Sequence, residues 1–179
     1  MLLTAIAERA EMRGWISVNV TDRDGMLSEI IVQLRQKASH ILAPETNSWL
    51  SEIHVHGVGF TRTREEVPST WRADMTKAVS ELNEKDAGLL ITVDEASAQS
   101  DELPVLIDSF QHFVRERRDV ALLLAGLPHN VSTLIDVDAI SFLRRAFKHT
   151  MDQISATDTS YAIKETVEGA GRGIAAPAL

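Results

Sequence analysis

The 179-residue sequence contains no cysteine, and its apolar runs are short. The lack of cysteine excludes disulfide bonds, thiolate nucleophiles, cysteine-ligated zinc and iron–sulfur clusters. The longest apolar stretches, around Gly88–Val93 and Val120–Leu127, fall well below the roughly 20 residues that a membrane helix needs. No basic region precedes an apolar segment at the N-terminus, so a signal peptide is not indicated. We therefore expect a soluble, cytoplasmic protein with no membrane partner.

Basic residues are also fewer than acidic ones. The chain has 18 Lys and Arg against 26 Asp and Glu, a formal net charge of −8. Such a chain is repelled by phosphate backbones, so no nucleic-acid partner is predicted. Apolar residues make up 44% of the chain and charged residues 25%, which is the composition of a globular protein with a buried core.

Helical and strand-like patterns alternate along most of the chain. Apolar residues at helical spacing predict helices, and short apolar or β-branched runs predict strands. Helices are predicted at Leu2–Gly14, Met26–Ser39, Trp71–Lys85, Leu103–Glu116, Asp138–Phe147 and Thr157–Glu168. Strands are predicted at Trp15–Val20, Leu89–Val93 and Val120–Ala125. Because the last two runs are apolar on both faces, we expect an α/β fold of three layers, with a mostly parallel sheet between helices.

Three segments have weaker patterns. Trp49–Thr63 is expected to form two short strands or an irregular hairpin, and His149–Ile154 an extended piece. Gly169–Gly173 is expected to be a flexible tail. We place a core domain at residues 1–155 and the start of a helical lid with its tail at residues 156–179.

An acidic pair, Asp94 and Glu95, follows the most apolar strand. Ligands bind at the carboxyl ends of the strands in an open parallel sheet. Nucleotide triphosphatases place two carboxylates there, the first to hold Mg²⁺ and the second to polarise the attacking water. The alternative is that an apolar strand simply ends at a polar turn, with Asp94 capping the next segment.

The ordered set of these segments resembles the core of an AAA+ or related STAND-type P-loop ATPase. Leu89–Glu95 resembles the Walker B strand, which implies Mg²⁺ binding by Asp94 and water activation by Glu95. Val120–Pro128 resembles the next strand, whose tip carries the sensor-1 position, so Gly126 is the implied nucleotide contact. The usual Asn, Ser or Thr is absent from this tip. The resemblance implies ATP and Mg²⁺ as cofactors.

The phosphate-binding loop of that family is missing from the sequence. No G-x-x-x-x-G-K-[ST] motif occurs in the 179 residues, although the helix at Leu2–Gly14 resembles the one that follows this loop. Either the loop is encoded upstream, or the protein is a relative that retained the scaffold and lost the chemistry. Without the loop's N–H groups and lysine, Asp94 and Glu95 present only negative charge to a polyphosphate. We expect weak or no ATP binding and no hydrolysis by this chain.

The strand before the loop lies inside the family's sheet, so its absence is expected to expose the edge of Val120–Ala125. An exposed edge favours pairing with another chain, or with His149–Ile154. This gives a second hypothesis of a different class, a non-catalytic protein-interaction module that uses the edge or the acidic surface.

Other candidate residues have plausible structural explanations. Arg144 and Arg145 lie on a predicted helix where an AAA+ protein can direct an arginine at a neighbouring subunit's γ-phosphate. A solvated helix face in an acidic protein is the preferred explanation. His54 and His56 point to one side of a strand as two metal ligands would, with only Glu52 nearby as a third.

Overall fold

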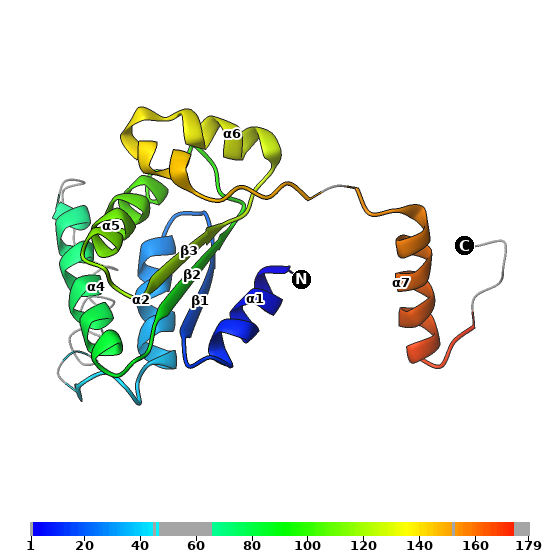
Figure 1. The fold of residues 1–179 in the computed structure, drawn as a ribbon, viewed down its shortest axis with the longest axis horizontal. Helices are drawn as coiled ribbons and strands as arrows, with labels where there is room; N and C mark the ends of the chain where they lie inside the picture. Colours follow the sequence, from blue (N-terminus) through cyan, green and yellow to red (C-terminus); the bar gives the residue numbers. More distant parts are fainter. Residues whose placement is uncertain (1, 45, 47–65, 152, 174–179) are drawn as a thin grey trace. The chain divides into compact units, whose positions relative to one another are not determined.

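The computed structural model describes residues 2–44, 46, 66–151 and 153–173 (Figure 1). Contacts between residues divide the chain into two units, Met1–Ala146 and Phe147–Leu179. The first unit contains all three strands of the described residues, and its fold is α/β with parallel strands, as the sequence predicts.

The strands β1 (Ile16–Thr21), β2 (Leu89–Asp94) and β3 (Val120–Leu124) form one open parallel sheet in the order β1-β2-β3. The register places Val18 beside Ile91, and Ile91 beside Leu122. Because neighbouring strands run the same way, their carboxyl ends lie together at one end of the sheet, which we call the carboxyl end.

One face of the sheet supports the hydrophobic core. Side chains alternate along a strand, so Val18, Ile91 and Leu122 share this face with their neighbours two residues away. The buried helical side chains of the core come mainly from α2 (Met26–Lys37), α4 (Glu66–Glu84) and α5 (Leu103–Arg115). The helices after β3 add Leu134 and Leu143. A buried hydrogen bond also joins α4 to α2, since the Trp71 indole donates to the carbonyl of Leu27 at 3.0 Å.

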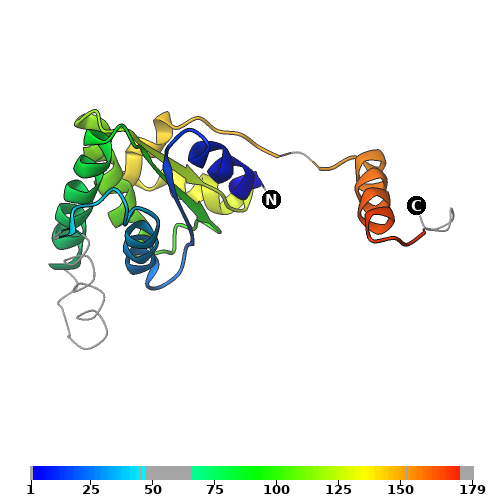
Figure 2. The same ribbon diagram turned by 90° about the horizontal axis from the view of Figure 1, so that it is seen from below.

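The opposite face of the sheet is more polar. It carries Ser17 and Thr92, both buried, and Asn19, whose side-chain oxygen accepts a 2.7 Å hydrogen bond from the Thr92 hydroxyl. Helix α1 (Leu2–Glu11) contacts β1 and β2 and buries Ala7. Figures 1 and 2 show α1 on the side of the sheet away from α2.

The structure differs from the sequence predictions after β3 and at the start of α4. Residues Pro128–Asp136 form helix α6, which the sequence analysis missed. The short helix predicted at Asp138–Phe147 is present as a 3-10 helix, η1, over Asp138–Arg145. Proline is tolerated in the first turn of a helix, where its missing N–H has no partner to lose, so Pro128 begins α6 rather than only ending a strand. For the same reason α4 begins at Glu66, ahead of Pro68.

The second unit contains helix α7 (Ala156–Gly169), close to the predicted bounds. Ser155 caps it, because its hydroxyl accepts a 3.0 Å hydrogen bond from the N–H of Asp158. No residue of α7 is buried. The described part of His149–Ile154 forms no strand. No described helix has the length and apolar character required to cross a membrane.

Candidate functional site

Two aspartates lie next to each other at the carboxyl end of the sheet. Asp94 is the last residue of β2, and Asp22 directly follows β1. The backbone N–H of Asp22 donates to the carbonyl of Asp94 at 2.9 Å, which extends the pairing of the two strands by one residue. The predicted position of Asp94, at the carboxyl end of an apolar strand, is confirmed, and the structure shows that this strand is the middle one.

The carboxylate of Asp22 is only half satisfied by hydrogen bonds. Its Oδ2 accepts from the backbone N–H of Ser97 at 2.9 Å, whereas its buried Oδ1 has no hydrogen-bond partner among the described residues. Sequence analysis missed Asp22 because it lies in a short polar segment that indicates a turn. The same rule that singled out Asp94, an acidic residue after a parallel strand, would have identified it.

Glu95 has a backbone conformation that is unusual for a side-chain-bearing residue. Its φ is 58°, in the left-handed region. Among the described residues, two other non-glycine residues share this conformation, Asp86 and Arg117. They follow the ends of α4 and α5, where helices commonly finish in this way. Glu95 instead follows a strand, and its N–H donates to Oδ1 of Asp94 at 2.9 Å. The turn leaves the Glu95 side chain exposed beside the partly buried Asp94.

Gly126 also lies near the carboxyl end of the sheet, and packing explains why this residue is a glycine. Between β3 and Gly126, Ala125 donates to the carbonyl of Val93 and accepts from the N–H of Ala96, each at 2.8 Å. A Cβ on Gly126 would stand 2.7 Å from the carbonyl oxygen of Ala96. Glycine is therefore required by the close approach of two loops, whether or not a nucleotide binds there.

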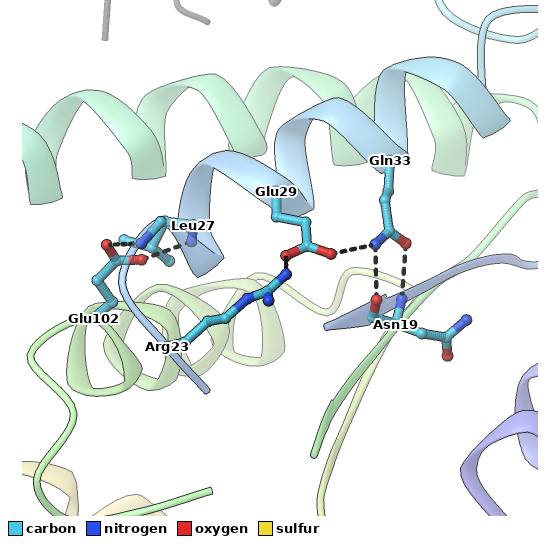
Figure 3. A network of polar contacts seen from close by, with 7 residues as sticks. Asn19, Arg23, Leu27, Glu29, Gln33 and Glu102 are labelled. Carbon is cyan, nitrogen blue, oxygen red and sulfur yellow. Dashed lines mark hydrogen bonds and ion pairs between the residues drawn. The ribbon is translucent and has the colours of Figure 1, made fainter. Parts of the chain in front are cut away.

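The N-terminus of α2 lies at the carboxyl end of the sheet, and a carboxylate of the protein binds its free N–H groups. Helix α2 has no side-chain cap from the residue that precedes it, Gly25. Glu102, just before α5, supplies one: its Oε1 and Oε2 accept from the N–H groups of Gly25 at 2.9 Å and Leu27 at 2.8 Å (Figure 3). These are the donors that would otherwise suit a phosphate.

The two arginines that the sequence singled out lie in η1, which contacts α5 and α6. The Arg144 guanidinium donates to the carbonyl of Ile135 in α6 at 3.4 Å, and Arg145 is exposed. No ion pair joins either arginine to Asp22, Asp94 or Glu95 within the residues described.

The described residues fit the phosphate groups of ATP poorly. No basic side chain among them pairs with the acidic residues at the carboxyl end of the sheet, and the amides at the start of α2 are bonded to Glu102. No cluster of three or more His, Asp or Glu suited to a metal ion occurs in the described ranges. Glu52, His54 and His56, the weaker metal candidate, lie outside those ranges, as does all of Trp49–Thr63.

Comparison of the chain with models of protein families, with curated proteins and with solved structures gave no match.

Proposed function

We propose that the chain provides the α/β core of an AAA+-like ATP-dependent switch, and that the 179 residues by themselves neither bind nor hydrolyse ATP. The observation that carries this proposal is the acidic pair Asp94–Glu95 at the carboxyl end of the middle strand of a parallel sheet. The strand order agrees with the proposal, because β3 lies at the edge where the resemblance leaves an inner strand unfilled. In the complete three-layer P-loop arrangement, that strand would extend the sheet beyond β3, and further helices would cover its faces.

The roles proposed for individual residues come from the resemblance to AAA+ proteins, and the contacts around these residues restrict which roles are possible. Asp94 would hold Mg²⁺, Glu95 would orient water, Gly126 would lie near the nucleotide, and Arg144 or Arg145 would act across a subunit boundary. Because Glu102 occupies the amides of α2 and the nearby carboxylates repel a polyphosphate, we expect this chain to leave the phosphates of ATP unbound.

Calorimetric titration of Mg-ATP into the 179-residue chain tests the inactive half of the proposal. We expect no binding to the wild type or to Asp94→Ala, with Glu84→Ala as an acidic control on the exposed end of α4. Micromolar binding that Asp94→Ala abolishes and Glu84→Ala retains would contradict it, and would indicate a phosphate-binding site of another kind.

Translation of the upstream DNA in frame tests the ATPase half. If a glycine-rich loop with a lysine is found there, the longer chain should bind Mg-ATP, and Glu95→Gln should abolish hydrolysis while retaining binding. Binding and hydrolysis that Asp94→Ala and Glu95→Gln leave unchanged would refute the roles assigned here.

A second candidate function is a non-catalytic protein-interaction module. The observation that favours it is the open edge of β3, where all five residues are only partly buried.

A further inference from the structure

The two edges of the sheet are not equivalent, because a side chain closes one of them. Ile16 and Asp22 donate their backbone N–H groups toward β2, so the period of two along β1 directs the N–H and carbonyl of Asn19 away from the sheet. The side-chain amide of Gln33 binds both groups: its oxygen accepts from the Asn19 N–H at 3.1 Å, and its nitrogen donates to the Asn19 carbonyl at 2.7 Å. Gln33 thus takes the place of a further strand.

A chain of contacts fixes Gln33 in that position. Its side-chain nitrogen also donates to Glu29 at 3.1 Å, and Glu29 in turn pairs with Arg23 at 3.0 Å (Figure 3). The edge of β1 is therefore protected in the way that sheet proteins use against unwanted strand pairing.

The edge of β3 has no such protection in the described part of the chain. The N–H of Ala125 donates to Val93 of β2 at 2.8 Å. Counting back by two along β3, the N–H and carbonyl groups of Leu122 and Leu124 point away from β2. These four groups form no hydrogen bond among the described residues.

We propose that the β3 edge of the 179-residue chain pairs with β3 of a second copy, antiparallel and about a two-fold axis at Leu122. In a longer chain that supplies the inner strand of the ATPase proposal, that strand would take this place instead. Two identical edges can close into a symmetric pair only when they run antiparallel. The pair would join two three-stranded sheets into one of six strands. It would satisfy the N–H and carbonyl of Leu122 and the N–H of Leu124 on both copies. The carbonyl of Leu124 would accept from Val120 of the second copy, whose N–H donates to the carbonyl of Arg118 at 2.9 Å in the single chain.

The side chains along the edge suit this occupant. The pairing brings Leu122 opposite Leu122 of the second copy, Val120 opposite Leu124, and Ala121 opposite Leu123. No charge lies within β3, and the flanking Asp119 would face an alanine rather than another acid. Five residues on each side form a small interface, so we expect a dissociation constant of about 10–100 µM.

Sedimentation equilibrium of the 179-residue chain, without nucleotide or metal, is the primary test. Between about 5 and 500 µM we expect a reversible monomer–dimer equilibrium. Leu122→Pro should shift it at least tenfold toward monomer, because proline removes an N–H that points outward and breaks no bond to β2. Asn19→Pro places a proline at the protected edge, where it also removes the hydrogen bonds from the Asn19 N–H to Gln33 and from Thr92 to the Asn19 side chain, and it should leave dimerisation unchanged. A strictly monomeric wild type, or dimerisation that Asn19→Pro weakens and Leu122→Pro does not, would overturn the proposal.

Hydrogen exchange of the wild type, followed by NMR, provides a test that needs no variant to fold. The amides of Leu122 and Leu124 should exchange at least fivefold more slowly at 500 µM than at 5 µM, while the Asn19 amide exchanges equally at both. Slow exchange at every concentration would indicate that another strand of the same chain covers β3, and fast exchange in a dimer would place the interface elsewhere. Either result overturns the dimer proposal. The ATPase proposal is tested separately by nucleotide binding, which neither assay involves.

Discussion

The carboxylate of Glu102 accepts a hydrogen bond of 2.8 Å from the backbone N–H of Leu27, across 75 residues of sequence. With the second bond to the N–H of Gly25, this side chain caps a helix that has no cap of its own. The contact also ties the loop before α5 to the loop after β1, so it fixes the relative position of two segments at the carboxyl end of the sheet. A negative charge at this position is favoured by the helix dipole.

Replacing Glu102 should destabilise the fold measurably. Glu102→Ala leaves two N–H groups at the start of α2 without a partner, and we expect the free energy of unfolding to fall by about 1–2 kcal/mol. Glu102→Gln retains an acceptor but loses the charge, so its free energy of unfolding should fall by less than that of Glu102→Ala. Urea denaturation monitored by circular dichroism measures both variants. Glu84→Ala, an exposed acidic residue at the end of α4, is the control and should change stability by less than about 0.5 kcal/mol.

Glu11 makes the stability depend on pH at the acidic end. A hydrogen bond from Ser17, together with one from Lys37 at 3.1 Å, lowers the pKa of the Glu11 carboxyl in the folded state. A lowered folded pKa contributes stability that is present above the ordinary glutamate pKa of about 4.3 and is lost as the pH falls below it.

Glu11→Gln should therefore be less stable than the wild type at pH 7, and the difference should shrink as the pH is lowered from 5 to 3. Urea midpoints measured across this range test the sign. A difference that is independent of pH would assign the effect to packing rather than to the charge of Glu11.

Gly126 should prove necessary for stability even when no nucleotide is present. A Cβ at this position would stand 2.7 Å from the carbonyl oxygen of Ala96, so one of the two loops must move. We expect Gly126→Ala to lower the free energy of unfolding by about 1–3 kcal/mol. Gly169→Ala, at the end of α7, has nothing within 4 Å of the added carbon and is the matched control. Equal midpoints for the two variants in thermal unfolding would refute the steric argument.

Sequence patterns alone predicted most of the regular structure. The apolar runs of β2 and β3 and the helical spacing in α2 and α5 are local signals, and the observed bounds agree within two residues. The position of Asp94 followed from the same reasoning. Helix α6 was missed because Pro128 was interpreted as the end of a strand, and because Val131, Thr133 and Ile135 are β-branched residues that favour helices weakly.

The side-chain contacts at the carboxyl end of the sheet and at the outer edge of β1 could not be predicted in this way. Glu102 meets Gly25 across 77 residues, and Gln33 meets Asn19 across 14. No spacing rule relates such pairs, because the side chains come together only once the strands and helices are packed. The resemblance predicted an open edge at β3. No feature of the sequence indicated that the Gln33 side chain protects the edge of β1.

Removing the Gln33 amide should convert the protected edge into a second open one. In Gln33→Ala the N–H and carbonyl of Asn19 lose their partners, and we expect the free energy of unfolding to fall by about 1 kcal/mol. A chain with two open edges can pair at both, so assembly no longer stops at a closed dimer and larger species should form as concentration rises. Sedimentation velocity at about 500 µM measures the distribution. Gln36→Ala, an exposed glutamine on the same helix, matches the change in helix propensity and should leave the distribution unchanged. If Gln33→Ala and Gln36→Ala give the same distribution, the amide of Gln33 does not protect the edge of β1 from strand pairing.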